Sequence, residues 1–259
     1  LISADDPGMH SSQNEQDNRW YGKFAKIPVL EPGDSDEAYR FTKLAFELSE
    51  QYDTAVIVRT TTRVSHARSL TEIGARALYS GIPYQKDATK YVMLPGNARR
   101  RKPAVLKRVR DLEEYADRSP VNSVEVGDTS LGFITGGISY QYVKEAFPKA
   151  SVLKLGMSYP LPKRLIQDFV DKVDQVFVAE ELDPFWESEI RAMGIPVHGK
   201  DVFPEIGELS PQILREGVLR ALGDVVPAQQ MLTEPVNSLS PGVASLPGRP
   251  PVLCPGCPH

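Results

Sequence analysis

The chain has 259 residues, which is enough for one large domain or two ordinary ones, each with its own core. Hydrophobic residues make up 41% and charged residues 25%, a globular composition that argues against wholesale disorder. A net charge of −4 gives no reason to expect a polyanion, so we predict no nucleic-acid partner. Apolar runs such as Ala55–Val58 are too short to cross a bilayer, so we predict no membrane association.

The first half of the chain begins with a polar segment. The first 25 residues are rich in Asp, Asn, Gln and Ser, the composition of an irregular loop that can hydrogen-bond a ligand. Asp34 and Glu37 have capping-box spacing, and apolar residues then recur at helical period, which predicts a helix over 36–52. The apolar, β-branched run 54–59 predicts a strand covered on both faces.

The second half of the chain alternates strands and helices. A connection over 60–100 leads to a helix with Val105, Val109, Leu112 and Ala116 on one face. From about residue 120 the pattern predicts a parallel sheet with crossover helices. The expected strands are 131–135, 151–155, 175–179 and 195–198, and the expected helices end at Phe147 or cover 162–172, 184–193 and 211–222. Residues 224–251 are rich in Pro, Ser and Gly, which is typical of an extended linker.

The opening loop holds the densest set of polar side chains. A loop that leaves the end of a parallel strand lies where α/β proteins bind ligands. Arg19 can donate two parallel hydrogen bonds to the carboxylate of a substrate, or it can form a structural ion pair. A solvated surface loop is the alternative for the whole segment. The candidate residues facing a substrate or cofactor are His10, Ser11, Ser12, Gln13, Asn14, Asp17 and Arg19.

A second polar group follows the predicted strand 54–59. Hydroxyls and cations there can line a pocket or hold the opening loop, and the candidates are Arg59, Thr60, Thr61 and Arg63. His66 can exchange protons near neutral pH, although a lone histidine is more often a hydrogen-bonded structural residue.

Three further features have two interpretations each. The basic run 99–102 could bind the phosphates of nucleic acid or coenzyme A. The acidic residues after it favour a solvent-exposed helix face or ion pairs at a domain interface. Gly136 and Gly137 can hold an anion at a helix N-terminus or allow close strand–helix packing, and the second is favoured. Glu180 and Glu181, at the end of a predicted strand, can act as an acid or base.

The two cysteines, Cys254 and Cys257, lie in the closing segment CPGCPH. They exclude a disulfide framework and favour a reducing, cytoplasmic setting. Their spacing supplies two ligands of a zinc or iron–sulfur site but cannot complete one. The chain also opens on what resembles the end of a strand and closes inside this motif, so we expect an internal fragment.

Seven blocks of sequence, in order through the whole chain, resemble the α subunits of indolepyruvate:ferredoxin oxidoreductases, which depend on thiamine diphosphate. The blocks are SADDPGMHSSQNEQDNR (3–19), VRTTTRVSHARS (58–69), YVMLPGNARRRKP (91–103), GFITGGISYQYVKEA (132–146), LKLGMSYPLP (153–162), FVAEELDPFWE (177–187) and CPGCPH (254–259).

The resemblance implies an α/β fold in three parts. Residues 1–118 would be the end of a thiamine pyrimidine-binding domain and a connection, and residues 119–223 a transketolase C-terminal-like parallel-sheet domain. Residues 224–259 would be a linker and the start of a diphosphate-binding domain. The opening loop would face thiamine and substrate, with Arg19 loosely matching an arginine that holds the substrate carboxylate in related enzymes.

The resemblance also implies an electron-transport function. The full enzyme would use thiamine diphosphate with Mg²⁺ and 4Fe–4S clusters to oxidise an aryl-pyruvate such as indolepyruvate to an acyl-CoA, with ferredoxin as acceptor. Its partners would be a β subunit, ferredoxin, the 2-oxo acid and coenzyme A, and Cys254 and Cys257 would be cluster ligands. We expect the fragment alone to be inactive, with no cofactor bound. The alternatives are another thiamine-dependent 2-oxo-acid enzyme and a non-catalytic binding or assembly module of this fold.

Overall fold

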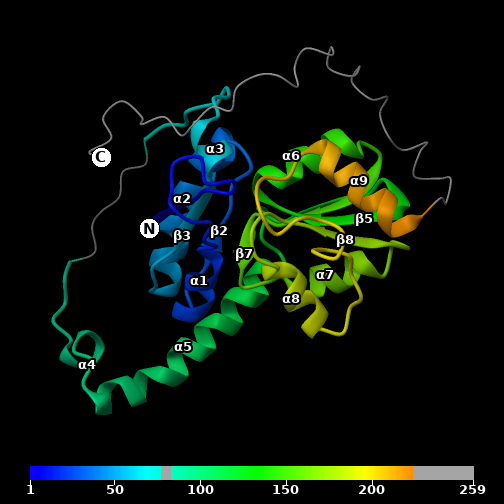
Figure 1. Cartoon of the computed structure of the whole chain (residues 1–259). Coiled ribbons are helices and arrows are strands. Elements are labelled where there is room, and N and C mark those ends of the chain that lie inside the picture. The colour runs from blue at the N-terminus through cyan, green and yellow to red at the C-terminus, as the bar shows by residue number, and fades with distance from the viewer. Residues whose placement is uncertain (77–82, 224–259) are drawn as a thin grey trace.

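A computed structural model describes residues 1–76 and 83–223 of the chain, and these residues form two α/β units side by side (Figure 1). The expected linker over 224–251 and both cysteines lie outside the described residues. Among the described helices, none combines the length and the apolar character needed to cross a membrane.

The first unit is built on a four-stranded sheet. Its strand order is β1 (Ile2–Asp5), β3 (Ile57–Thr61), β2 (Val29–Leu30) and β7 (Met157–Tyr159), and the first three are parallel. Helix α1 (Arg19–Ala25) follows the opening loop, and α2 (Ser35–Tyr52) packs an apolar face into the core of this unit.

Helix α2 begins where the sequence predicts. The Asp34 carboxylate accepts a hydrogen bond from the Glu37 N–H, and the Glu37 carboxylate accepts one from the Gly33 N–H, 2.8 Å each. These two bonds satisfy amides that the first helical turn leaves without an intrahelical partner. Phe41, Ala45 and Leu48 are buried at helical period, as the apolar pattern predicts.

The second unit has its own four-stranded sheet. The order is β4 (Ser123–Glu125), β6 (Ala150–Lys154), β5 (Asp128–Thr135) and β8 (Val176–Ala179), with β4 antiparallel and the others parallel. Helices α6 (Gly137–Ala146) and α9 (Pro211–Leu222) pack on one face, and α7 (Lys163–Val170) and α8 (Phe185–Ala192) on the other. Alternate residues of β5 and β8 therefore enter two separate cores, as in a sheet covered on both sides.

The expected alternation is confirmed for β5, β6 and β8 and the helices around them, whereas the antiparallel strand β4 and strand β7 were not predicted. In place of the strand predicted at 195–198, the structure has a single parallel bridge between Phe177 and His198. Pro196 lacks an N–H and cannot extend a ladder, although Ile195 and Val197 on either side of it are buried.

Strand β7 joins the two units. The chain leaves β6 at the centre of the second unit, and Met157 and Tyr159 then pair antiparallel with β2 of the first unit. The Asn122 side chain accepts hydrogen bonds from the N–H groups of Gly156 and Met157, 2.9 Å each, and fixes this crossing.

The connection between the units is mostly helical and exposed. It contains α3 (Thr62–His66), α4 (Ala88–Tyr91) and the long α5 (Pro95–Ala116), which extends away from both sheets (Figure 1). Helix α5 begins ten residues before the first apolar residue that predicted it, and only Leu112 and Ala116 are fully buried.

Gly136→Ala should destabilise the fold. A Cβ at this position would lie 2.4 Å from the Leu155 carbonyl oxygen and 2.6 Å from the Trp186 ring. Overpacking of this kind costs about 1–3 kcal/mol. The matched control is Gly96→Ala in the first turn of α5, where a Cβ meets nothing within 4 Å. The control should be neutral or slightly stabilising in urea unfolding, and equal effects of the two changes would contradict the packing account.

Candidate functional site

The opening loop leaves the carboxyl end of β1 and returns to α1. Asp6 holds it: the Asp6 carboxylate accepts hydrogen bonds from the Ser11 N–H (2.7 Å), the Ser12 N–H (2.8 Å) and the Thr62 hydroxyl. Although burial opposes it, these bonds keep the pKa of Asp6 well below its usual range. The loop therefore has a fixed backbone, and His10, Ser11, Gln13 and Asn14 remain exposed on it.

Arg19, at the start of α1, is 1% exposed and bridges the two units. Its guanidinium donates to both Asp17 oxygens and to the Glu180 carboxylate (2.7 Å). It also donates to the Glu181 and Asp183 carbonyls, at 3.1 and 3.2 Å, and lies about 5 Å from the Phe185 and Trp186 rings. This enclosure favours the structural ion pair over a substrate contact.

Arg59, on β3, forms the second half of the same buried network. Its guanidinium donates to Asp5 (2.6 Å) and to Glu31, and it lies 3.9 Å from Asp17. The Ser158 hydroxyl of β7 also donates to Glu31, so β7 is tied to the network. We define the buried charge network as Asp5, Asp17, Arg19, Glu31, Arg59 and Glu180.

The network contains four carboxyl groups and two guanidinium groups, so backbone amides must stabilise the excess negative charge. Glu180 accepts from the Trp186 and Glu187 N–H groups at the start of α8, at 3.0 and 2.9 Å. Although burial opposes it, the charges of Arg19 and Arg59 lower the pKa of Asp17 to about 2. Burial raises the pKa of Asp5, whose Oδ1 has no partner among the described residues.

Glu208 of the second unit contacts the exposed side of the opening loop. Its carboxylate accepts two hydrogen bonds from Arg63, 2.6 Å each, and lies 3.0 Å from the His10 ring. Glu15 of the loop accepts from the Gly207 N–H beside it (2.9 Å). The loop is therefore held by both units, and Arg63 binds Glu208, which in turn contacts His10 of the loop.

The other candidates near β3 are separated from this cluster. Thr60 shares a 3.0 Å hydrogen bond with Ser65, and Thr61 is buried with a hydroxyl that has no partner among the described residues. His66, at the end of α3, is exposed. The polar side chains after β3 thus point to several different environments and do not form one group.

Glu180 and Glu181 are both buried, and their hydrogen-bond partners distinguish them. Glu180 caps α8 and pairs with Arg19, which makes it structural. Glu181 accepts only the Leu209 N–H (3.0 Å), and burial raises its pKa to about 7, although that bond and Arg59 lower it. A pKa in this range suits a carboxyl group that exchanges a proton near neutral pH.

Sequence reasoning missed Glu31, Ser158 and Glu208. Glu31 and Glu208 lie outside the helices and strands, Ser158 lies in a strand of three residues, and each meets a partner far away along the chain. Gly137 shows why the pair 136–137 is glycine: it has φ +52°, and a Cβ there would meet Glu31 at 2.7 Å. Close packing is therefore its role.

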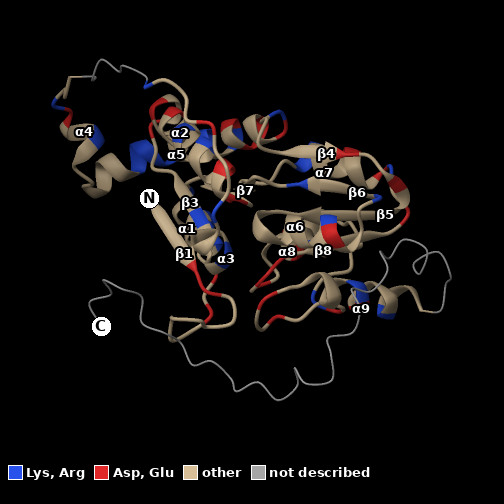
Figure 2. Cartoon of the chain, turned by 90° about the horizontal axis from the view of Figure 1, so that it is seen from above, with Lys and Arg blue, Asp and Glu red and all other residues tan. Residues whose placement is uncertain are grey.

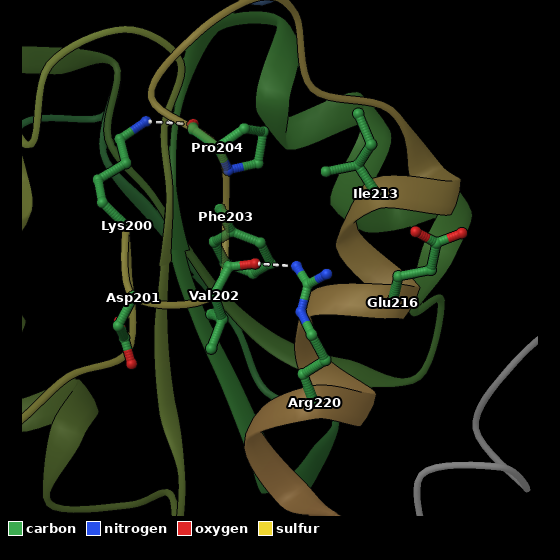
Figure 3. Close-up of a pocket in the computed structure, with 8 residues that line it drawn as sticks. All are labelled: Lys200, Asp201, Val202, Phe203, Pro204, Ile213, Glu216 and Arg220. Carbon is green, nitrogen blue, oxygen red and sulfur yellow. Dashed lines mark hydrogen bonds between the residues drawn. The ribbon is translucent and has the colours of Figure 1, made fainter.

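A separate cavity of about 340 Å³ lies between α9 and residues 200–204 (Figure 3). Its two cations are already bound to backbone. Arg220 donates to the Val202 carbonyl (2.6 Å), and Lys200 donates to the Pro204 carbonyl (3.1 Å) and the Glu180 carbonyl (2.7 Å). Within residues 1–76 and 83–223, no group of three or more His, Cys, Asp or Glu is placed to hold a metal ion.

Comparisons with known proteins show which sequences and folds the chain resembles. No protein-family model matches the chain. The whole chain is 44% identical to indolepyruvate oxidoreductase subunit IorA of Archaeoglobus fulgidus, of which it covers 43%, and 39% identical to IorA of Thermococcus kodakarensis, of which it covers 42%. The chain is similar to these IorA subunits over its whole length. It spans about two fifths of the length of these curated relatives.

A solved structure confirms the fold class of this IorA homologue. The 2-oxoglutarate:ferredoxin oxidoreductase from Magnetococcus marinus matches 85% of the chain, and the match covers 52% of that protein, with a TM-score of 0.57 and 16% identity. The predicted α/β class with parallel sheets is therefore correct, and the predicted resemblance to indolepyruvate oxidoreductase subunits is confirmed.

Arg19→Met should destabilise the fold by about 3–5 kcal/mol, because it leaves Asp17 and Glu180 buried without their cation. Arg63→Met is the control, since Arg63 is 55% exposed and an exposed pair contributes about 0–1 kcal/mol. Urea unfolding at neutral pH measures both. An Arg19 variant as stable as the control would show that the network does not hold the units together.

Glu181→Gln should flatten the dependence of stability on pH. Burial raises the folded pKa to about 7, above the usual glutamate value of about 4.3, so between these values the folded state binds more protons than the unfolded state and wild-type stability falls as pH rises. The loss is about 3 kcal/mol between pH 4.5 and 8. Unfolding free energies measured across this range should show a smaller fall in Glu181→Gln, while the exposed control Glu205→Gln should follow the wild type.

Proposed function

We propose that this chain is part of an oxidoreductase that oxidatively decarboxylates aryl-pyruvates such as indolepyruvate. The products would be an acyl-CoA and carbon dioxide, and ferredoxin would take the electrons. The observation that supports the proposal most strongly is whole-length similarity, at 37–44% identity, to six curated subunits named indolepyruvate oxidoreductase IorA.

The geometry of the opening loop supports a substrate-facing role. The backbone is fixed by Asp6 and Glu15, while His10, Ser11, Gln13 and Asn14 keep exposed polar side chains at the carboxyl end of β1. Fixed donors and acceptors can orient a polar 2-oxo acid for attack at its keto carbon. We propose that these side chains contact the substrate and that Arg19 positions them from within the protein.

The cofactors and partners of the whole enzyme are part of the proposal. Thiamine diphosphate with Mg²⁺ would stabilise the carbanion formed on decarboxylation, and 4Fe–4S clusters would carry the electrons. Residues 1–76 and 83–223 contain no group of three or more His, Cys, Asp or Glu that could hold Mg²⁺. Cys254 and Cys257 remain proposed cluster ligands. A β subunit, ferredoxin, coenzyme A and a cytoplasmic location complete the proposal.

The division into three parts is also a proposal. Residues 1–118 would end a pyrimidine-binding domain, residues 119–223 would form a transketolase C-terminal-like domain, and residues 224–259 would lead to a diphosphate-binding domain. The two sheets support the first division. Strand β7 crosses this boundary, because residues 157–159 belong to the second part by sequence but pair with the sheet of the first unit.

An acceptor-reduction assay tests the proposal. The product of the complete gene, with its partner subunit, thiamine diphosphate and coenzyme A, would be offered indolepyruvate, phenylpyruvate or pyruvate with ferredoxin or a viologen. We expect reduction that is fastest with the aryl-pyruvates, and none by the 259-residue chain alone. No reduction by a preparation shown to hold thiamine and clusters would favour the binding or assembly module.

Variants of the opening loop refine this assay. Gln13→Ala and Asn14→Ala should lower kcat/KM for indolepyruvate by about tenfold or more if they contact the substrate, since a good hydrogen bond contributes roughly 1.4 kcal/mol. Gln167→Ala, an exposed change on α7, is the matched control. Unchanged kinetics in both loop variants would remove the loop from the substrate site and leave the oxidoreductase proposal intact.

A further inference from the structure

The opening loop meets the second unit at a single carboxylate, that of Glu15. Its Oε1 atom accepts hydrogen bonds from the Gly8 N–H of the loop and from the Gly207 N–H of the second unit, the latter at 2.9 Å. Figure 2, in which Asp and Glu are red, shows acidic residues of both units at this junction. Because the two amides share one oxygen atom, the backbone at residue 8 and the backbone at residue 207 lie close together.

Each side of this junction carries one exposed apolar side chain. Met9 follows Gly8 and is 45% exposed, and Ile206 precedes Gly207 and is 77% exposed. Within residues 6–18 and 199–210, these two are the large apolar side chains that are exposed. The two units therefore bring one apolar side chain each to the edge of the polar loop.

The backbone of Met9 has an unusual conformation. Its φ of +50° lies in the left-handed region, which a residue with an apolar side chain rarely adopts. The Met9 N–H donates to the Asp6 carbonyl (2.9 Å), and the Asp6 carboxylate binds the next two amides of the loop, so the loop enforces this conformation. Backbone strain of this kind collects at ligand-binding sites. Glycine or asparagine would fit the position more easily, so the exposed thioether calls for a functional reason.

We propose that Met9 and Ile206 bind the aryl ring of the 2-oxo acid and set the preference for aryl-pyruvates over pyruvate. The inference rests on the proposed function and names residues that select its substrate. All 2-oxo acids share the carboxylate and the keto group, so an enzyme distinguishes them by contact with the rest of the molecule. Polar side chains beside two apolar ones form a site for a small ligand with a charged end and a ring.

The chemistry and the extent of this patch favour a small ring over a protein partner. A methionine side chain is unbranched and polarizable, so it adapts to a flat aromatic surface and makes favourable sulfur–aromatic contacts. A stable protein interface buries about 800 Å² on each partner around an apolar centre. Two apolar side chains, with the exposed polar residues Gln13 and Asn14 on the same loop, are too few for such a centre.

Substrate competition in the complete enzyme, with its partner subunit, tests the inference. Ile206→Ser and Met9→Asn should each lower kcat/KM for indolepyruvate by about tenfold and leave that for pyruvate unchanged, because only the larger substrate loses an apolar contact. Asparagine tolerates the left-handed conformation, so Met9→Asn should keep the shape of the loop. Val126→Ser, at a 70% exposed site outside the junction, is the control and should change neither value.

Inhibition by indole-3-propionate separates binding from turnover, because this acid lacks the keto group that reacts. Its inhibition constant should rise about tenfold in the Ile206 and Met9 variants and stay unchanged in the control. An enzyme that oxidises no aryl-pyruvate would contradict the proposed function itself. A wild-type preference for indolepyruvate that persists in both variants would contradict this inference alone. Loss of the partner subunit from either variant in sedimentation velocity would also contradict it, and would assign the side chain to a subunit interface.

Discussion

The relation between the two units depends on one buried guanidinium, that of Arg19. It lies at the start of a short helix of the first unit. It pairs with Asp17 of that unit and takes its other partners from the second unit, between β8 and α8. Because a buried charge is costly without partners, the pairing can form only when β8, α8 and the opening loop adopt one arrangement. Glu180 strengthens that constraint by capping α8 with the same carboxylate.

The network explains how an irregular polar loop acquires a defined shape. The loop is anchored at one end through Asp6, at the other through Asp17, and on its outer side through Glu208. The exposed polar groups of the loop then lie on a backbone that is already ordered, which would lower the entropic cost of binding the substrate that we propose for them. Glu181 adds a carboxyl group close to neutral pKa beside this loop.

The spacing of apolar residues predicted the helices and strands that bury an apolar face. Helix α2, with its Asp34 cap, and strands β5, β6 and β8 were predictable because each has enough residues to show a pattern. Helix α1 was missed because it buries only Arg19 and Gly22, and β2 and β7 because two or three residues show no period. The site was only partly predictable, since Arg19 and Glu180 are 161 residues apart and sequence spacing carries no signal of their pairing.

Hydrogen exchange on the complete, thiamine-loaded enzyme would test most directly whether the opening loop faces the substrate. Amides of residues 10–14 would be followed with and without indolepyruvate, with pyruvate as the comparison. The account predicts slower exchange in this loop with the aryl-pyruvate, and no change around Arg19, which is already enclosed. Unchanged exchange in the loop, in an enzyme that turns over indolepyruvate, would contradict it.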